Sequence, residues 1–93
     1  SKGQALLVDP DRRRADDTAA YLRGMGLAVS VYPTGRDVLR RLGRSADVDL
    51  IGADRHVPAP ELPDLVAQLR ADTNAARVPV LVVASADRPI PPS

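Results

Sequence analysis

The chain contains no cysteine, phenylalanine or tryptophan, and it has only two tyrosines, one histidine and one lysine. The missing cysteines exclude disulfides and thiolate metal sites. A single histidine, His56, argues against a histidine-based zinc site and against serine–histidine catalysis. With so few aromatic rings, the chain lacks the stacking platforms that bind single-stranded nucleic acid. The core of the protein must therefore be aliphatic.

Charge and hydropathy exclude further classes of protein. The formal net charge of the 93 residues is +1, so no general polyanion or membrane surface is indicated as a partner. No apolar run approaches the length of about 18 residues that a membrane span requires, and no signal peptide is visible. We therefore expect one small domain in the cytoplasm, without a nucleic-acid or membrane partner.

Four short apolar runs recur along the chain and predict four β-strands. They cover residues 5–8, 28–32, 48–53 and 78–84. Three of them, the first, third and fourth, show little alternation, which is typical of parallel strands covered on both faces. The second run alternates between apolar and polar residues more clearly, which favours an edge strand.

Helical patterns separate these runs, over residues 13–25, 34–43 and 61–71. A capping box of Thr34 and Asp37 starts the second helix, and the glycines of "GMG" end the first. The predicted apolar stripes comprise Ala15, Ala19, Leu22 and Met25 in the first helix, Val38, Leu39 and Leu42 in the second, and Leu62, Leu65, Val66 and Leu69 in the third.

The resulting order, β-α-β-α-β-α-β, predicts an α/β domain with a parallel sheet, right-handed crossovers and helices on both faces. We place this domain at residues 1–87. Residues 88–93, "RPIPPS", are rich in proline and read as a tail or linker.

Polar side chains follow three of the predicted strands. Asp9 follows the first, Asp54 the third and Ser85 the fourth. With the strand order 2-1-3-4, Asp9 and Asp54 lie side by side where ligands bind in such sheets. Two neighbouring carboxylates suit Mg²⁺, and a carboxylate beside a cation can accept a phosphoryl group. The hydroxyl of Ser85 could hydrogen-bond a phosphate oxygen.

Four segments, "ALLVDPD", "VYPTGRDVLRRL", "DLIGADRHVP" and "VPVLVVASA", resemble the receiver domain of bacterial response regulators, which has a three-layer αβα, flavodoxin-like fold. The resemblance implies that Asp54 is the phospho-acceptor and that Asp9 and Asp54 hold Mg²⁺. It also implies that Ser85 is the switch hydroxyl, and it makes Asp11 a weak member of the acidic pocket.

The chain also departs from that family. Pro10 stands where a second acidic residue is usual, which weakens the expected Mg²⁺ site. The usual fourth helix, fifth strand with its lysine and fifth helix are absent, and Lys2, the only lysine, precedes the first strand. We therefore predict a degenerate receiver module of a two-component phosphorelay that acts by protein–protein interaction and is not an enzyme. The alternative is a competent receiver, phosphorylated on Asp54 by a histidine kinase with Mg²⁺.

Other interpretations of these residues stay open. Asp54 can simply begin a loop, and Asp9 can be a turn residue before a proline. Asp11 fits the N-cap of the first helix better than a metal site. A hydrolase of related fold would carry a second aspartate two residues after Asp54, but His56 stands there, and we expect it to be an exposed loop residue.

Two surface features of the chain bear on its possible partners. The arginines at 12–14 lie among aspartates and indicate a solvated helix start. The fourth strand is apolar on both faces, which predicts an association edge at Val80 and Val82. Through this edge we expect a homo-oligomer such as a dimer, or a contact with a histidine kinase or another signalling protein.

Overall fold

Four parallel strands form one sheet in the order β2-β1-β3-β4 in the computed structural model, which describes residues 3–44, 47–57, 61–71 and 76–83. Along the chain the elements are β1 (Gly3–Val8), α1 (Arg12–Gly24), β2 (Leu27–Tyr32), α2 (Gly35–Leu42), β3 (Leu50–Asp54), α3 (Glu61–Ala71) and β4 (Val80–Val83). The element order and the strand order predicted from the sequence are both confirmed.

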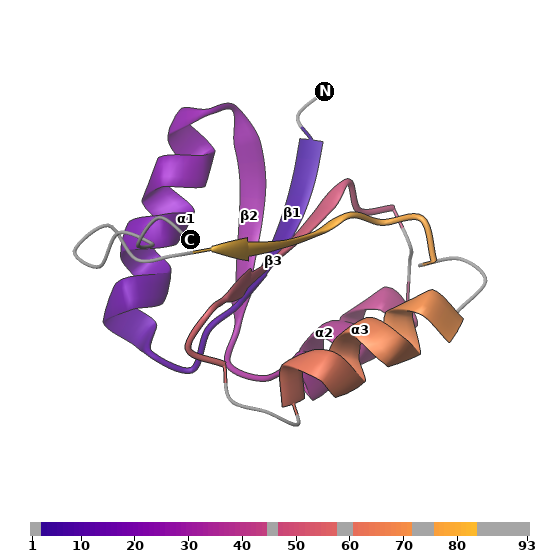
Figure 1. Ribbon diagram of the computed structural model, residues 1–93. Helices are drawn as coiled ribbons and strands as arrows, with labels where there is room; N and C mark the ends of the chain where they lie inside the picture. The colour runs from indigo at the N-terminus through magenta and orange to yellow at the C-terminus, as the bar shows by residue number, and fades with distance from the viewer. Residues whose placement is uncertain (1–2, 45–46, 58–60, 72–75, 84–93) are drawn as a thin grey trace, which may run out of the picture.

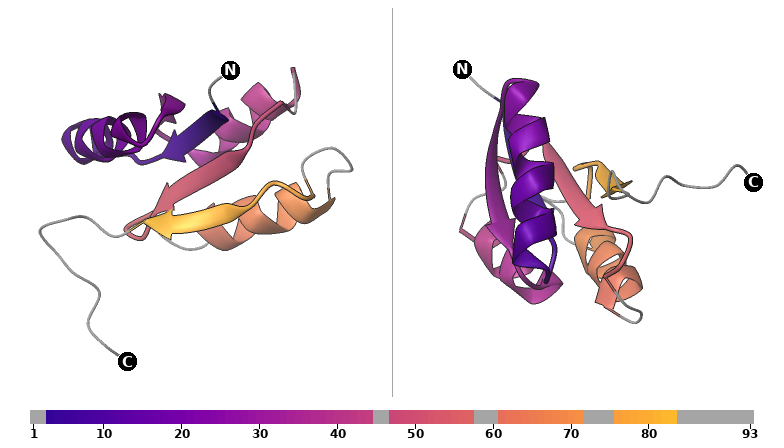
Figure 2. Two further views of the ribbon diagram at one scale, coloured as in Figure 1. Left: turned by 90° about the horizontal axis from the view of Figure 1, so that it is seen from above. Right: turned by 90° about the vertical axis from the view of Figure 1, so that its left-hand side faces the viewer.

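The helices lie in two layers, one on each face of the sheet. Helix α1 covers one face, and α2 and α3 lie together on the other (Figure 1). The views in Figure 2 show β4 at one border of the sheet. The predicted three-layer αβα architecture is therefore confirmed, and β2 occupies the opposite edge, as its alternating pattern indicated.

Strand β1 is buried on both faces because each face carries its own hydrophobic cluster. Leu6 and Val8 pack toward α2 and α3, whereas Ala5 and Leu7 pack toward α1. Alternate side chains of a strand point to opposite faces, so a continuous apolar run suits a strand with a helix layer on each side. The continuous apolar run of β1, residues 5–8, thus lies inside the sheet between two helix layers.

Local sequence explains where α1 ends and where α2 begins. Gly26 adopts a φ of 94°, a left-handed conformation that favours glycine, and it follows the end of α1 at Gly24. Met25, which we predicted on the apolar stripe, is 65% exposed because it lies beyond that end. Thr34 is the N-cap of α2 as predicted, since the Asp37 amide donates a hydrogen bond to the Thr34 hydroxyl oxygen; the hydroxyl in turn donates to the Asp37 carboxylate.

Strand β4 is the least covered part of the sheet. Val80 packs against the core, whereas Leu81 and Val82 are about half exposed, at 52% and 50%. Within the described ranges, no strand pairs with the outer edge of β4. The exposed apolar pair is therefore Leu81 and Val82, and of the two residues predicted at an association edge only Val82 is exposed. Ser85 and residues 88–93 lie outside the described residues.

Candidate functional site

Two carboxylates lie side by side at the carboxyl edge of the sheet. Val8 pairs with Ala53 in the parallel register of β1 and β3, which brings Asp9 next to Asp54. Asp54 is the last residue of β3 rather than the first residue after it, and Asp9 directly follows β1. Both are buried, with 2% and 1% of their surface exposed, so they need partners inside the protein.

Arg14, in the first turn of α1, is the partner that the two carboxylates share. Its Nε donates to Asp9 Oδ2 at 2.9 Å and its Nη2 donates to Asp9 Oδ1 at 2.7 Å. The same Nε lies 3.2 Å from Asp54 Oδ2. The prediction that the arginines at 12–14 form a solvated helix start is wrong for Arg14, because this side chain turns back over the strand ends.

The start of α1 positions this arginine. Asp11 is the N-cap of the helix, and its Oδ1 accepts a hydrogen bond from the Arg14 amide at 3.0 Å. The Asp11 amide in turn donates to Asp9 Oδ1 at 2.9 Å, which ties the cap to the strand end. As the N-cap, Asp11 is largely exposed, and its carboxylate takes the structural role that its sequence position allowed.

The pKa shifts at the site have the same local causes. The hydrogen bond from the Arg14 amide lowers the pKa of Asp11 below its ordinary value of 3.8. The hydrogen bond to the Asp9 carboxylate raises the pKa of the Arg14 guanidinium further above its already high ordinary value. Both shifts favour the charged forms of Asp11 and Arg14, so Arg14 stays a cation beside the carboxylates of the site.

The remaining contacts of Asp54 come from the turn that follows β3. Its Oδ1 accepts the His56 amide at 2.7 Å, and the His56 ring Nδ1 lies 2.7 Å from the same oxygen. The prediction that His56 is an exposed loop residue is wrong, since its side chain is 31% exposed and contacts the carboxylate. Asp54 Oδ2 is different, because it is buried without a hydrogen-bond partner among the described residues.

The donor set does not suit a divalent cation as it stands. Asp9 and Asp54 are the two inward carboxylates, and Pro10 contributes no oxygen ligand from its side chain. Across the described ranges, no cluster of three or more acidic, histidine or cysteine side chains is arranged to hold a metal ion. The Mg²⁺ site predicted from Asp9 and Asp54 thus contains two possible ligands, and both already face a guanidinium.

Arg14 and His56 were not predicted from the sequence as members of the site. Arg14 lies three residues after the N-cap, a position from which a long side chain can reach back to the strand end. His56 lies two residues after a buried carboxylate, where side chain and backbone can both reach that carboxylate. Both spacings are visible in the sequence, but the polar and charged residues around Arg14 and His56 indicated that their side chains would be exposed to solvent.

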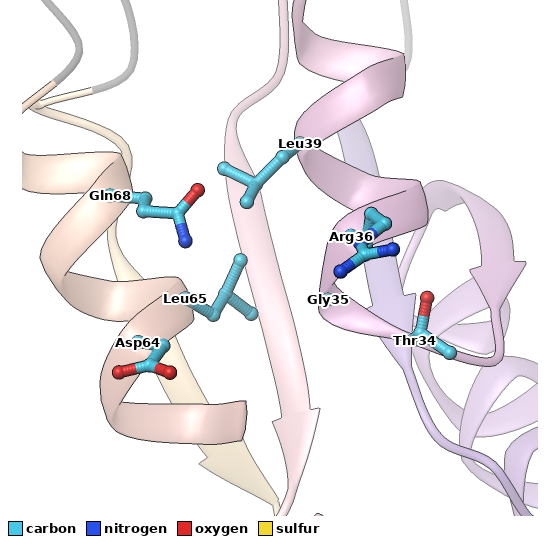
Figure 3. A pocket seen from close by; sticks show the side chains of 7 residues that line it. All are labelled: Thr34, Gly35, Arg36, Leu39, Asp64, Leu65 and Gln68. Carbon is cyan, nitrogen blue, oxygen red and sulfur yellow. The ribbon is translucent and has the colours of Figure 1, made fainter. Parts of the chain in front are cut away.

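A second feature is a groove of about 370 Å³ between α2 and α3 (Figure 3). Leu39 and Leu65 face each other across it, and its rim is polar. The lining residues are Thr34, Gly35, Arg36, Leu39, Asp64, Leu65 and Gln68. None of them belongs to the carboxylate site, so the groove is a separate surface.

Comparisons with known proteins identify the fold. The structure is similar to the chemotaxis response regulator CheY4 of Vibrio cholerae, with a TM-score of 0.78 and 21% identity over 88% of this chain and 68% of that chain. It is also similar to the N-terminal domain of a response regulator receiver protein from Methanoculleus marisnigri JR1, with a TM-score of 0.78 and 21% identity over 99% and 72% of the two chains.

A response regulator receiver protein from Pseudomonas putida gives a TM-score of 0.76 with 20% identity, over 90% of this chain and 69% of that chain. No protein-family model and no curated protein sequence matches the chain. The chain spans about two thirds of the length of these three structures and has the flavodoxin-like fold of response regulator receiver domains. None of the described helices is long and apolar enough to cross a membrane.

Proposed function

We propose that this chain is a receiver-like signalling module of a two-component phosphorelay that works through protein–protein contacts without phosphorylation of Asp54. The observation that carries the proposal is the carboxylate site itself. Asp9 and Asp54 lie together at the edge where receivers of this fold carry out their chemistry, yet both are engaged by Arg14. Such a module would act in the bacterial cytoplasm, with a histidine kinase or another signalling protein as its partner.

Phosphorylation gives the first test of this proposal. After incubation with acetyl phosphate and Mg²⁺, we expect the intact mass of the protein to show no phosphoryl adduct. The reason is that Arg14 shields both carboxylates, and Pro10 supplies no further acidic ligand. Asp54→Asn is the comparison variant, and Asp17→Asn, which changes an exposed aspartate of α1, is the matched control.

A competent receiver is the second candidate function, and one observation favours it. Among the described residues, Asp54 Oδ2 is buried without a hydrogen-bond partner, although Arg14 Nε lies 3.2 Å from it. In a competent receiver this oxygen would attack the phosphorus atom of acetyl phosphate, and acetate would leave. An adduct on the parent and on Asp17→Asn, but not on Asp54→Asn, would establish this function and contradict the degenerate module.

The proposed partner surface is the border of the sheet at β4, and the occupant we propose is a second copy of the chain. Leu81 and Val82 are each about half exposed, and the backbone groups on the outer edge of β4 have no strand beside them within the described ranges. An apolar edge strand favours association with another strand, and pairing of two β4 edges across a two-fold axis would cover both.

We expect light scattering at high micromolar concentration to give a mass above the 9.9 kDa of one chain. Val82→Lys should return the mass to that of the monomer, because a charge on the border opposes strand pairing. Tyr21→Lys, which changes an apolar residue that is 70% exposed on α1, should behave like the parent. A parent that stays monomeric throughout the concentration range would rule out self-association and leave a different signalling protein as the partner.

A further inference from the structure

The guanidinium of Arg14 lies where it touches both buried carboxylates at once. It forms a two-point hydrogen bond with Asp9, at 2.7 and 2.9 Å, and its Nε is 3.2 Å from Asp54 Oδ2. The Arg14 side chain is 23% exposed, whereas the two aspartate side chains are 1% and 2% exposed. The cation therefore lies on the solvent side of the two carboxylates, and the three side chains together form what we call the carboxylate pocket.

The fold holds Arg14 in this position through its backbone as well as its side chain. Its amide is bound by the N-cap carboxylate of Asp11, and the Asp11 amide is bound by Asp9. Helix α1 thus starts from the strand end that carries one of the two buried carboxylates. From the third position of the helix the Arg14 side chain reaches that strand end, whereas Arg12 and Arg13 in the same turn are exposed.

Three of the four oxygens of Asp9 and Asp54 already accept hydrogen bonds from the protein. Asp9 Oδ1 accepts two hydrogen bonds and Oδ2 accepts one, all from Arg14 and the Asp11 amide. Asp54 Oδ1 accepts the His56 amide and contacts its ring. A divalent cation bound to both carboxylates would have to displace the guanidinium, because two cations cannot share this small volume without strong repulsion.

We infer that Arg14 is the resident cation of this pocket, which takes the place of a divalent metal ion between Asp9 and Asp54 and keeps such ions out. This inference rests on the proposed function, since it explains why a receiver-like pocket stays closed to chemistry. It also assigns a role to Arg14 that neither the charge pattern nor the likeness in fold supplied.

Titration with Mn²⁺ as a paramagnetic probe tests the inference. We expect Arg14→Ala to bind Mn²⁺ at least about tenfold more tightly than the parent, since the variant keeps both carboxylates and loses the charge that opposes the ion. Bound Mn²⁺ is counted by electron paramagnetic resonance, and Mg²⁺ should displace it. Equal binding by the parent and Arg14→Ala would overturn the inference.

Two controls locate the effect at the pocket. Arg13→Ala removes a neighbouring exposed arginine and should bind Mn²⁺ as weakly as the parent. Arg14→Ala combined with Asp9→Asn should lose the gained affinity, because one of the two ligands is gone. Gained affinity that persists in this double variant would place the ion elsewhere and contradict the inference.

The parent protein provides a test that does not depend on the folding of any variant. In amide-resolved nuclear magnetic resonance spectra, Mn²⁺ broadens the signals of residues close to it. We expect no selective broadening at Asp9, Arg14 and Asp54 in the parent. Selective broadening there would show that a divalent ion enters the pocket beside Arg14, and would overturn the inference.

The outcome can be separated from that of the proposed function. Selective Mn²⁺ broadening in the parent, together with no phosphoryl adduct, would contradict the role of Arg14 and leave the proposed function in place. A phosphoryl adduct on Asp54 of the parent, with tighter Mn²⁺ binding confined to Arg14→Ala, would contradict the proposed function and leave the role of Arg14 in place.

Discussion

Replacement of Arg14 by alanine is expected to lower the free energy of unfolding by about 3 kcal/mol, because it leaves two buried carboxylates without their shared cation. A domain of this size is stable by only about 5–15 kcal/mol, so the loss is a large share of the total. Urea unfolding followed by circular dichroism measures it. Arg13→Ala, an exposed neighbour, should change the stability by no more than about 0.5 kcal/mol.

A double-mutant cycle attributes this loss to the carboxylates. Asp9→Asn keeps the shape of the side chain and removes its charge, so Arg14→Ala should cost less when Asp9 is already asparagine. We expect a coupling energy of at least about 1 kcal/mol between the two positions, as for residues in one buried network. Strictly additive effects would mean that Arg14 stabilises the helix start by packing alone, independently of its ion pair.

The strand and helix order could be predicted because several local signals agree. The apolar runs that became β1 and β3 are almost continuous, and each lies between two covered faces. Thr34 marks the start of α2 because its side chain caps the helix, and Gly26 follows the end of α1 because glycine adopts the left-handed conformation there. Each of these features is decided by residues close together in the chain, so the sequence displays it directly.

The ion pairs of the site could not be predicted in the same way. Asp9 and Asp54 lie side by side because β1 and β3 are neighbours, and the strand order typical of doubly wound parallel sheets already predicts this. That Arg14 joins them depends on which residue caps α1 and on where that cap lies relative to the strand end. The mixture of arginines and aspartates at the start of α1 predicts a solvent-exposed segment. It does not show which of the three arginines at 12–14 turns inward.

His56 was misread for a related reason. Its position after a strand in a polar segment suggested an exposed loop, but the turn after β3 folds its amide and its ring onto Asp54. A buried carboxylate at a strand end has a strong requirement for donors, and the nearest residues in the turn can meet it. The need of the buried Asp54 carboxylate for hydrogen-bond donors therefore explains why His56 points inward.

The last and equally large effect concerns the central strand rather than the site. Leu6→Ala in β1 is expected to cost about 3 kcal/mol, within the range for deletion of a fully buried leucine side chain. Leu81→Ala in β4 makes the same chemical change at a residue that is 52% exposed, and it should cost less than about 1 kcal/mol. Thermal unfolding of the two variants at low micromolar concentration compares them without a contribution from self-association.

The comparison of Leu6→Ala with Leu81→Ala tests which strands contribute most to the free energy of unfolding. Leu6 packs in the cluster that joins the sheet to α2 and α3, with Leu65 and Leu69 from α3 among its members. If Leu81→Ala proved as costly as Leu6→Ala, Leu81 would be far less accessible in solution than its 52% exposure indicates, and the proposed association edge would be contradicted. A large difference instead means that the sheet is held by β1 and β3, and that the β4 border can take part in binding at little cost to the fold.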